Sequence, residues 1–527
     1  MSAPAAGDAT PWWRDAVVYQ IYPRSFADSD GDGVGDLAGI TSKLDYLADL
    51  GVDALWLSPI FTSPMHDFGY DVADYCGIDP IFGTDADFDD LLDGVHERGM
   101  RLLLDWVPNH SSSDHPWFVE SRSSRDNPKR DWYVWRDQHS DGSPPTNWMS
   151  QFKGVPAWTH DNATGQSYLH VFLSEQPDLN WANPDVESAM LDSLRYWLDR
   201  GVDGFRSDVV NLIGKGTDVD DLPDEFVTMP LLACDRPFGH ELLRRIRALL
   251  DSYDHEPMMV GEVYLLRAGE SASYLGTPEA PELHLSFDFR PIHTRWDAER
   301  MQLALSKMEA DFAEPGWPTF VLSNHDQPRH RTRYGSEPRA RAAAVVSLTL
   351  RGTPFLYAGE ELGLEDGVVP VDRVVDPDGR DGCRAPIPWT AAGDDEVGHG
   401  WPERPWLPFP ANASSHAADV QVGDPASMHA LYRQLLALRR EHGVLRRGDI
   451  SFVPVDGEVI RFERQLDADR MVVLVNFGET PIRWPDDLDA SSVLHSSFAS
   501  ARPELRQPTR SELHAGEAVV VRAAAAR

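Results

Sequence analysis

Short apolar runs alternate with amphipathic segments between residues 12 and 445. In the amphipathic segments, apolar residues recur at spacings of three and four, as at Phe88, Leu91, Leu92 and Val95, which is typical of a helix with one buried face. The apolar runs are short and bounded by Gly, Pro, Asn or Asp, which predicts buried strands. The eight predicted strands cover residues 17–22, 54–59, 101–107, 202–208, 258–263, 284–289, 319–324 and 353–358.

Strands that alternate with helices predict a parallel sheet, because each helix carries the chain back to the starting edge. Eight is the number of parallel strands that closes a (β/α)8 TIM barrel, so we expect an α/β fold of that kind. The sixth run, 284–289, has the weakest strand pattern of the eight.

Two insertions and a change of pattern divide the chain. Residues 110–180 are rich in Pro, Ser, Asp and Trp, and a structureless loop of that length is uncommon in a compact domain, so we predict an inserted subdomain after the third strand. A second insertion, 361–410, follows strand eight. The runs VIRFERQL, MVVLVNF and AVVVRA then predict an antiparallel β-sandwich in residues 446–527. The barrel itself would comprise residues 12–109 and 181–445.

The charge balance narrows the possible partners. With 85 acidic and 48 basic side chains the formal net charge is -37, which repels phosphate backbones and anionic lipids. We therefore expect no nucleic acid and no membrane surface as a partner. A neutral substrate is compatible with such a surface.

The cysteines and the N-terminal segment bear on the compartment. Cys76, Cys234 and Cys383 are widely separated and odd in number, which predicts neither a metal site nor a disulfide framework and favours a reducing cytoplasm. The segment MSAPAAGDATPWW has no basic n-region and no apolar h-region, so we expect no secretory signal. The sequence contains no stretch of 18 consecutive apolar residues, so we expect no transmembrane span.

Acidic residues occur at the ends of several predicted strands. Asp105, Asp208, Glu262 and Asp326 end or follow strands three, four, five and seven. One such residue is usually a helix cap or a loop ion pair. Several that converge from different strands on one mouth of a barrel indicate an active site, because catalytic groups of TIM barrels lie at the C-terminal strand ends.

The neighbours of these acids suggest two protonation states. In GFRSD, Arg206 and Asp208 lie two apart and share a face of the strand, so the guanidinium should keep Asp208 ionised. Glu262 lies among Val260 and Val263, where desolvation should keep it protonated. An ionised nucleophile and a protonated acid are what glycoside hydrolysis requires, and Asp326 would be a third, ionised group.

The chain resembles glycoside hydrolase family 13, the α-amylase family, and within it the α-glucosidase and oligo-1,6-glucosidase branch. The motifs that carry this resemblance occur in order along the chain: GVDALWLSP, DWVPNH, QPDLN, GFRSDV, GEV, LSNHDQPR and GTPFLYAGEE. The resemblance implies a catalytic triad of nucleophile Asp208, acid/base Glu262 and transition-state stabiliser Asp326. Asp105 and Asn109 also match family positions, but for Asp105 a buried role in organising loops is an equal alternative.

The resemblance also implies a sugar pocket. Tyr70 would stack under the first glucose and Asp71 would bind its far hydroxyls, paired across the pocket floor with Arg384. Ala385 and Ile387 depart from the family's usual Thr and Met beside this arginine. The other implied substrate-binding residues are His110, His325, Arg206 and Phe172, with Phe152 as a second aromatic wall candidate.

Glycine and aspartate alternate in DSDGDGVGD, residues 28–36, and the resemblance implies that this loop binds structural Ca²⁺. Oxygens at alternate positions suit a hard cation, although the loop is not an EF-hand because Gly39 occupies the twelfth position. The predicted ligands are Asp28, Asp30, Asp32, the Val34 carbonyl and Asp36. An acidic turn without an ion is the alternative.

We therefore predict a retaining exo-α-glucosidase acting on short, neutral oligosaccharides. The linkage stays open between α-1,4, which GRDGCRAPIPW favours, and α-1,6, which QPDLN and Val209 favour. A transglucosidase or a sugar isomerase of the trehalose or isomaltulose synthase type would use the same triad. A catalytically inactive, membrane-anchored relative is disfavoured, because all three carboxylates are present and no apolar span is.

Overall fold

The eight predicted strands form one parallel sheet in the computed structural model, which describes residues 10–216, 219–265, 269–394, 396–498 and 510–523. Their spatial order is β13-β10-β9-β5-β2-β1-β15-β14. Across the seam between the two end strands, the Thr319 hydroxyl donates a hydrogen bond of 3.1 Å to the Ser286 carbonyl, so the sheet nearly closes on itself. The strands are β1 Val18–Ile21, β2 Ala54–Leu57, β5 Arg101–Trp106, β9 Gly204–Ser207, β10 Met258–Gly261, β13 Leu285–Ser286, β14 Thr319–Val321 and β15 Thr353–Tyr357.

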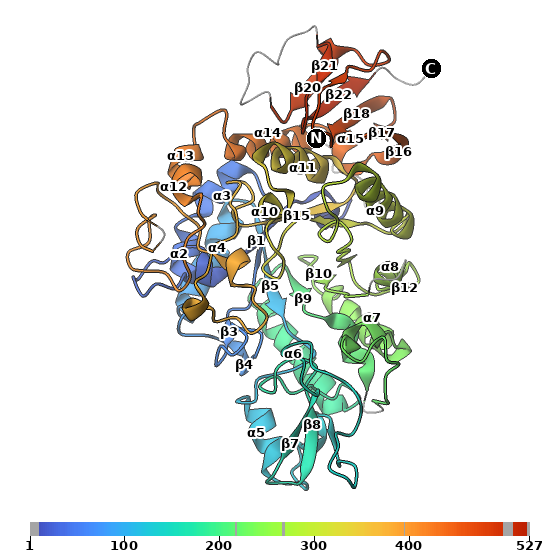
Figure 1. Ribbon diagram of the computed structural model, residues 1–527. Coiled ribbons are helices and arrows are strands. Elements are labelled where there is room, and N and C mark those ends of the chain that lie inside the picture. Colours follow the sequence, from blue (N-terminus) through green and yellow to red (C-terminus); the bar gives the residue numbers. More distant parts are fainter. Residues whose placement is uncertain (1–9, 217–218, 266–268, 395, 499–509, 524–527) are drawn as a thin grey trace.

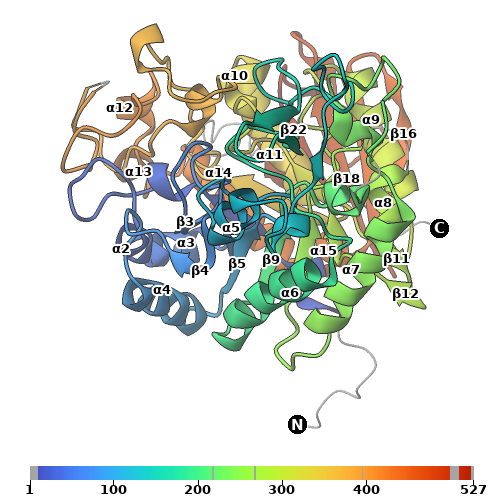
Figure 2. The ribbon, with the colours of Figure 1, turned by 90° about the horizontal axis from the view of Figure 1, so that it is seen from below.

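The predicted (β/α)8 barrel is thus confirmed, and its weakest strand is also its shortest: β13 pairs with β10 through two residues only. Helices surround the sheet and bury the apolar stripes seen in the sequence; in α4, Phe88, Leu91, Leu92 and Val95 are all buried. Figure 2 shows α4, α6 and α7 following one another around the barrel. The principal helices are α3 Leu44–Leu50, α4 Asp85–Glu97, α6 Pro184–Asp199, α7 Pro237–Leu250, α9 Ala298–Asp311, α11 Glu337–Thr349 and α14 Met428–Glu441.

The long connection after β5 folds as a small unit of its own. It contains helix α5 Pro116–Ser123 and a three-stranded antiparallel sheet in the order β6-β8-β7, built from β6 Trp135–Arg136, β7 Trp158–Asp161 and β8 Gln166–Leu169. Figure 1 places this unit at one end of the molecule and the C-terminal sheet at the other. The unit therefore lies on the side of the barrel where β5 ends, next to the C-terminal strand ends.

The C-terminal domain is antiparallel, as predicted. Its five-stranded sheet has the order β16-β17-β18-β22-β20, and the strands β19 Ile482–Arg483 and β21 Glu512–Leu513 form a second, two-stranded sheet. Val472, Leu474, Val519 and Val521 project from one face of the large sheet into a core shared with Trp484 and Leu513. The large sheet consists of β16 Asp449–Asp456, β17 Val459–Leu466, β18 Asp469–Asn476, β20 Val493–Ser496 and β22 Ala518–Ala523.

Within the described residues, no helix combines the length and the apolar character needed to cross a membrane. All three cysteines are free.

Candidate active site

A cavity of about 190 Å³ lies at the C-terminal ends of the barrel strands. Asp208 follows β9, Glu262 follows β10, and the loop after β14 supplies His325 and Asp326. The loop after β2, the inserted subdomain and the second insertion complete the wall. The cavity is lined by Asp67, Tyr70, His110, Gln151, Phe152, Phe172, Asp208, Val209, Met229, Leu231, Glu262, Tyr264, His325, Asp326, Gln327, Asp378 and Arg380.

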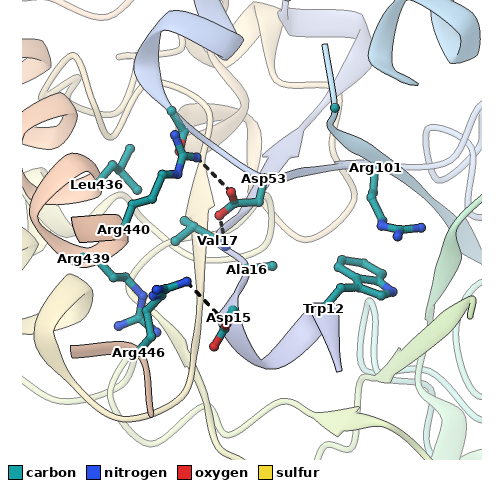
Figure 3. A pocket seen from close by; sticks show the side chains of 12 residues that line it. Trp12, Asp15, Ala16, Val17, Asp53, Arg101, Leu436, Arg439, Arg440 and Arg446 are labelled. Atoms are coloured by element: carbon teal, nitrogen blue, oxygen red, sulfur yellow. Dashed lines mark hydrogen bonds and ion pairs between the residues drawn. The ribbon is translucent and has the colours of Figure 1, made fainter. Parts of the chain in front are cut away.

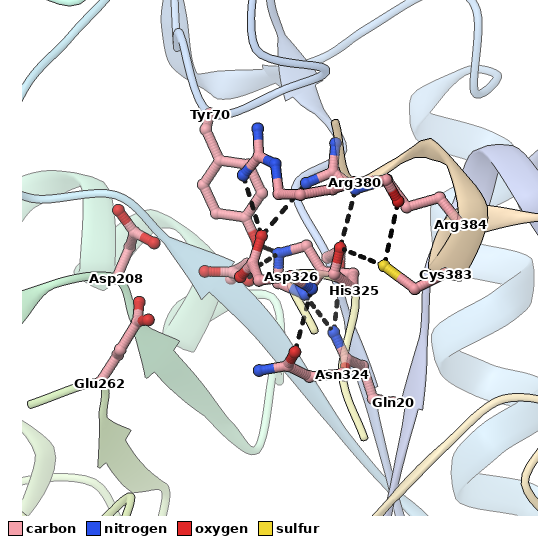
Figure 4. Close-up of polar contacts among 12 residues, drawn as sticks. Gln20, Tyr70, Asp208, Glu262, Asn324, His325, Asp326, Arg380, Cys383 and Arg384 are labelled. Atoms are coloured by element: carbon pink, nitrogen blue, oxygen red, sulfur yellow. Dashed lines mark hydrogen bonds and ion pairs between the residues drawn. The ribbon is translucent and has the colours of Figure 1, made fainter. Parts of the chain in front are cut away.

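Arg206 lies under this cavity and holds three carboxylates together. Its Nη1 lies 2.8 Å from an oxygen of Asp208 and 2.8 Å from an oxygen of Asp105, and its Nη2 lies 2.5 Å from Oε2 of Glu262. The register of the sheet explains the arrangement, because Arg206 pairs with Asp105 across β5 and β9 and with Val260 across β9 and β10. Figure 4 shows the carboxyls of Asp208 and Glu262 on the same side of the pocket.

The backbone after β9 takes a strained turn that serves the site. Val209 has φ 32° and ψ 46°, a left-handed conformation that is costly for a β-branched residue. In this conformation its N–H donates a hydrogen bond of 3.2 Å to Oε2 of Glu262. The strained conformation thus gives Glu262, the predicted acid/base, a second hydrogen-bond donor besides Arg206.

The electrostatic surroundings of Asp208 and Glu262 differ from those expected from the sequence. Burial raises the pKa of Asp208 well above its usual value, and the charges of Glu262 and Asp105 raise it further, while Arg206 opposes them. The expectation that Arg206 keeps Asp208 ionised was incomplete, because one guanidinium is shared among three carboxylates. Glu262 is likewise not isolated among apolar groups, since it contacts the same guanidinium.

Asp105 is fully buried beneath the cavity and does not line it. Burial raises its pKa to about 6, although Arg206 and the hydroxyl of Tyr70 lower it. The Tyr70 hydroxyl donates a hydrogen bond of 3.0 Å to Asp105, and the Trp56 indole donates another of 3.2 Å. Asp105 therefore orients groups that face the pocket.

Asp326 lies in a different electrostatic environment. Burial alone would raise its pKa, but His325 and the guanidinium groups of Arg380, Arg384 and Arg206 lower it below the usual range. Nη1 of Arg380 lies 2.9 Å from its carboxylate and Nη2 of Arg384 lies 3.2 Å away (Figure 4). Asp326 is thus ionised at neutral pH, as the sequence led us to expect.

The two predicted histidines are neutral. Burial lowers the pKa of His110 and of His325 to about 3. Gln20 Nε2 lies 2.8 Å from Nδ1 of His325, so Nδ1 accepts and Nε2 carries the proton. That Nε2 lies 2.6 Å from the Tyr70 hydroxyl, and the two rings stack with centroids 5.3 Å apart.

Two predicted recognition residues are placed differently from expectation. Asp71 is fully buried and does not line the cavity; its oxygens accept hydrogen bonds from Ser63 Oγ and from the backbone N–H groups of His66 and Asp67. Arg384 does not pair with Asp71 either: it contacts Asp326 and Asp376 and donates to the His325 carbonyl.

The Asp–Arg pair at the cavity wall is instead formed by Asp67 and Arg380, whose Nη2 and Oδ1 atoms lie 2.7 Å apart. Neither Asp67 nor Arg380 was predicted from the sequence, although each lies four positions before a predicted residue, Asp71 or Arg384. The feature that distinguishes Asp71 from Asp67 is a tight turn, in which backbone N–H groups donate hydrogen bonds to the Asp71 carboxylate.

Aromatic side chains from the inserted subdomain cover the cavity. Phe172 lies with its ring centroid 5.1 Å from that of His110 and 5.6 Å from that of Phe152. The guanidinium of Arg380 lies over the Phe152 ring at 5.1 Å. Both wall candidates named from the sequence therefore face the pocket.

The acidic loop at 28–36 brings three of its predicted ligands together. Carboxylate oxygens of Asp28, Asp30 and Asp36 lie within 4.8 Å of one another, whereas Asp32 is exposed and outside this group. Asp28 accepts hydrogen bonds from the N–H groups of Gly31 and Gly33, which curls the loop around it. A donor set made of carboxylate oxygens suits a hard divalent cation.

Comparison with known proteins gives consistent matches over almost the whole chain. The family profile described as alpha amylase, catalytic domain, matches residues 20–448. A probable alpha-glucosidase of Rhizobium meliloti (strain 1021) is 41% identical, over 89% of this chain and 90% of its own length. An oligo-1,6-glucosidase of Parageobacillus thermoglucosidasius is 38% identical, over 90% of this chain and 92% of its own. The solved trehalulose synthase of Pseudomonas mesoacidophila MX-45 superposes with a TM-score of 0.90 at 34% identity, covering 98% of this chain and all of that one.

Proposed function

This chain belongs to the α-amylase family, and on that premise we propose that it is a retaining, exo-acting α-glucosidase that releases glucose from the non-reducing end of short α-glucosidic oligosaccharides. The observation that carries the proposal is the convergence of Asp208, Glu262 and Asp326 on one cavity. The names of the relatives support an α-glucosidase, because both curated relatives described above are glucosidases.

The proposed mechanism is a double displacement. Asp208 attacks C1 of the sugar, while Glu262 gives a proton to the departing glycosidic oxygen, so that a glucosyl ester forms and the C1–O bond breaks. Glu262, now a base, takes a proton from water as the water oxygen attacks C1 and the carboxylate of Asp208 leaves. The ionised Asp326 supports the positive charge that develops on the ring, while His325 and Tyr70, whose Nε2 and hydroxyl oxygen lie 2.6 Å apart, line the pocket beside it.

Exo action is supported by an ion-paired wall of the cavity and by its volume. Arg380 joins Asp67 and Asp326 across one wall, which offers paired donors and acceptors to the hydroxyls of a terminal glucose. The volume of about 190 Å³ is below the roughly 300–1,000 Å³ of sites for drug-sized ligands, so it suits one sugar ring better than the interior of a chain.

The test is the variant Asp208→Asn, compared with Asp192→Asn on the exposed face of α6. We expect kcat on an aryl α-glucoside to fall at least about 10⁴-fold in the first variant and to stay within twofold in the second. Proton NMR of the wild-type reaction should show α-glucose as the first product. Wild-type turnover in Asp208→Asn would overturn the proposal, and β-glucose as the first product would overturn retention.

For the linkage we propose α-1,4 ahead of α-1,6, because the GRDGCRAPIPW segment, which supplies Arg380 to the pocket wall, resembles that of bacterial α-glucosidases acting on maltose-type α-1,4 bonds. A transglucosidase or a sugar isomerase of the trehalose or isomaltulose synthase type is the second candidate, favoured by the similarity to a solved trehalulose synthase. Chromatography of products from maltose, isomaltose and sucrose separates these cases. Free glucose from maltose supports the first proposal, whereas a rearranged disaccharide from sucrose supports the second.

We also propose that the loop at 28–36 holds a structural Ca²⁺ through Asp28, Asp30 and Asp36. Three carboxylates this close repel one another unless a cation lies between them. Chelation should lower Tm and added Ca²⁺ should restore it, while Asp36→Asn should abolish that response. A Tm that is indifferent to both chelator and Ca²⁺ would contradict the proposal.

For its setting we propose the cytoplasm, which the three free cysteines support. The proposed partner is a neutral oligosaccharide, and the net charge of -37 argues against polyanions as partners.

A further inference from the structure

A second cavity, of about 240 Å³, lies at the opposite mouth of the barrel. Val17 precedes β1, Asp53 precedes β2 and Arg101 begins β5, so these lining residues mark the N-terminal ends of the strands. The C-terminal part of α14 and the short helix α15 Gly443–Arg447 form the facing wall (Figure 3). The proposed glucosidase chemistry makes no use of this cavity.

Arg439, on α14, lines this cavity and is an unbalanced buried cation. Its side chain is 2% exposed, and its Nε is buried without a hydrogen-bond partner. It pairs with no carboxylate among the described residues, and burial lowers the pKa of its guanidinium only to about 10, so it is charged at neutral pH. Its two terminal nitrogens donate to the backbone carbonyls of Leu348, Leu350, Gly352 and Leu445.

A buried charge without a counter-charge is costly, and proteins usually provide a partner for it. The neighbouring acids Asp15 and Asp53 act on Arg439 only from a distance, as charges that raise its pKa, and neither forms an ion pair with it. Both oxygens of Asp53 are occupied, one by Nη2 of Arg440 at 2.9 Å and the other by the N–H of Val17 at 2.9 Å. Arg439 therefore brings to the cavity wall a positive charge that contacts no carboxylate among the described residues.

The rest of the wall repeats this pattern. Asp15 accepts from Arg447 and, at 3.4 Å, from Arg446, whose own Nε is buried without a partner. Arg101 is paired with Asp203 at 2.7 Å outside the cavity. Five arginines thus meet three aspartates in and around this cavity, in a chain whose acids outnumber its bases.

A rigid aromatic wall completes the cavity. The guanidinium of Arg101 lies over the Trp12 ring at 4.8 Å, and the indole N–H of Trp12 donates a hydrogen bond of 2.9 Å to the Glu256 carbonyl. Figure 3 shows the side chains of Trp12 and Arg101 next to each other on this wall. These two contacts fix the position of the Trp12 ring.

We propose that this cavity binds a phosphate group, either free or on a small phosphate monoester. A tetrahedral oxyanion can accept hydrogen bonds from several guanidinium groups at once, and arginine is suited to such contacts because its donors form a planar fork. Four arginines, Arg101, Arg439, Arg440 and Arg446, line the cavity against two aspartates, and this excess of guanidinium groups supplies the positive charge that would hold the anion. The site lies at the other mouth of the barrel from Asp208 and Glu262, so it does not depend on the proposed function.

Isothermal titration of the full chain with inorganic phosphate at low ionic strength tests the proposal. We expect one site with a Kd below about 1 mM. Arg446→Gln, on α15, should weaken binding at least tenfold, whereas Arg433→Gln, on the exposed face of α14, should leave it unchanged. Arg439→Gln should abolish binding; if it does not fold, Arg446→Gln carries the test, because Arg446 is partly exposed at the surface.

Further measurements identify the ligand and the cavity that binds it. Glucose 6-phosphate that competes with phosphate identifies the monoester as a ligand, and binding of phosphate alone identifies the free ion. Asp208→Asn should bind phosphate as the wild type does, which separates this cavity from the sugar pocket. The proposal is overturned if the wild type takes up no phosphate at about 10 mM, if Arg446→Gln binds normally, or if chloride at the same concentration displaces phosphate equally.

Discussion

The two mouths of the barrel each bury charge that the protein itself does not balance, but the sign is opposite. At the C-terminal mouth, the single guanidinium of Arg206 serves Asp105, Asp208 and Glu262. At the N-terminal mouth, the partners of the buried Arg439 guanidinium within the described part of the chain are carbonyl oxygens. Parallel strands make both arrangements possible, because each mouth collects residues from several strands.

The opposite signs indicate which kind of charge each mouth of the barrel would stabilise. Unbalanced carboxylates favour a positive charge, and the sugar ring develops one as the glycosidic bond breaks. An unbalanced guanidinium favours an anion that arrives from solution. At the C-terminal mouth the charge would be used during a reaction, and at the N-terminal mouth it would be used in binding.

The largest expected effect comes from removing the shared cation at the C-terminal mouth. Arg206→Met leaves three carboxylates with no guanidinium between them, so they must retain protons or separate. We expect kcat to fall about 10²–10³-fold or more. Steady-state kinetics on an aryl α-glucoside measures this.

The matched control is Arg101→Gln at the N-terminal mouth, which should keep wild-type kcat. Equal losses in the two variants would mean that the two charge clusters act only through the stability of the barrel. Thermal unfolding of both variants, followed by circular dichroism, excludes an effect through stability alone if their Tm values agree.

A smaller effect separates two aspartates four residues apart. Asp67 faces the sugar pocket and contacts Arg380, whereas the oxygens of Asp71 are consumed by Ser63 and by backbone N–H groups. Asp67→Asn should lower kcat/KM about 10²-fold with little change in Tm. Asp71→Asn should keep kcat/KM within about fivefold and lower the free energy of unfolding by about 1–3 kcal/mol.

The reverse result, in which Asp71→Asn loses kcat/KM and keeps Tm, would restore Asp71 as the recognition residue. Chemical denaturation with the kinetics of both variants decides between the two assignments.

These two aspartates also show where sequence reasoning stops. Strand-end residues such as Asp208 were predictable, because strand periodicity fixes the end of a strand and the barrel fixes where that end points. Asp67 and Arg380 lie in irregular loops. In the loop after β2, a tight turn determines that Asp71, and not Asp67, accepts the hydrogen bonds of the backbone N–H groups. Spacing alone does not contain that information.

The cavity at the N-terminal mouth could not be predicted from the sequence at all. Trp12, Asp53, Arg101 and Arg439 come from four distant segments, and each has an ordinary surface or capping role when considered alone. Only their packing shows that the guanidinium of Arg439 has lost water without gaining a carboxylate. The charge sharing at Arg206 was missed for the same reason, because GFRSD displays one carboxylate and the fold supplies two more.

The smallest effect is a shift in pH dependence at the C-terminal mouth. The charge of Asp105 raises the pKa of Asp208, so Asp105→Asn should lower that pKa and move the acid limb of kcat/KM to lower pH, by up to about one pH unit. The pKa of Asp105 itself is raised from 3.8 to about 6, so the folded state binds more protons than the unfolded state in that range. Wild-type stability from this group is therefore lost as pH rises from about 4 to 6. The Tm of Asp105→Asn relative to wild type should rise over the same interval, and an acid limb that moves to higher pH would contradict the picture of one guanidinium shared among three carboxylates.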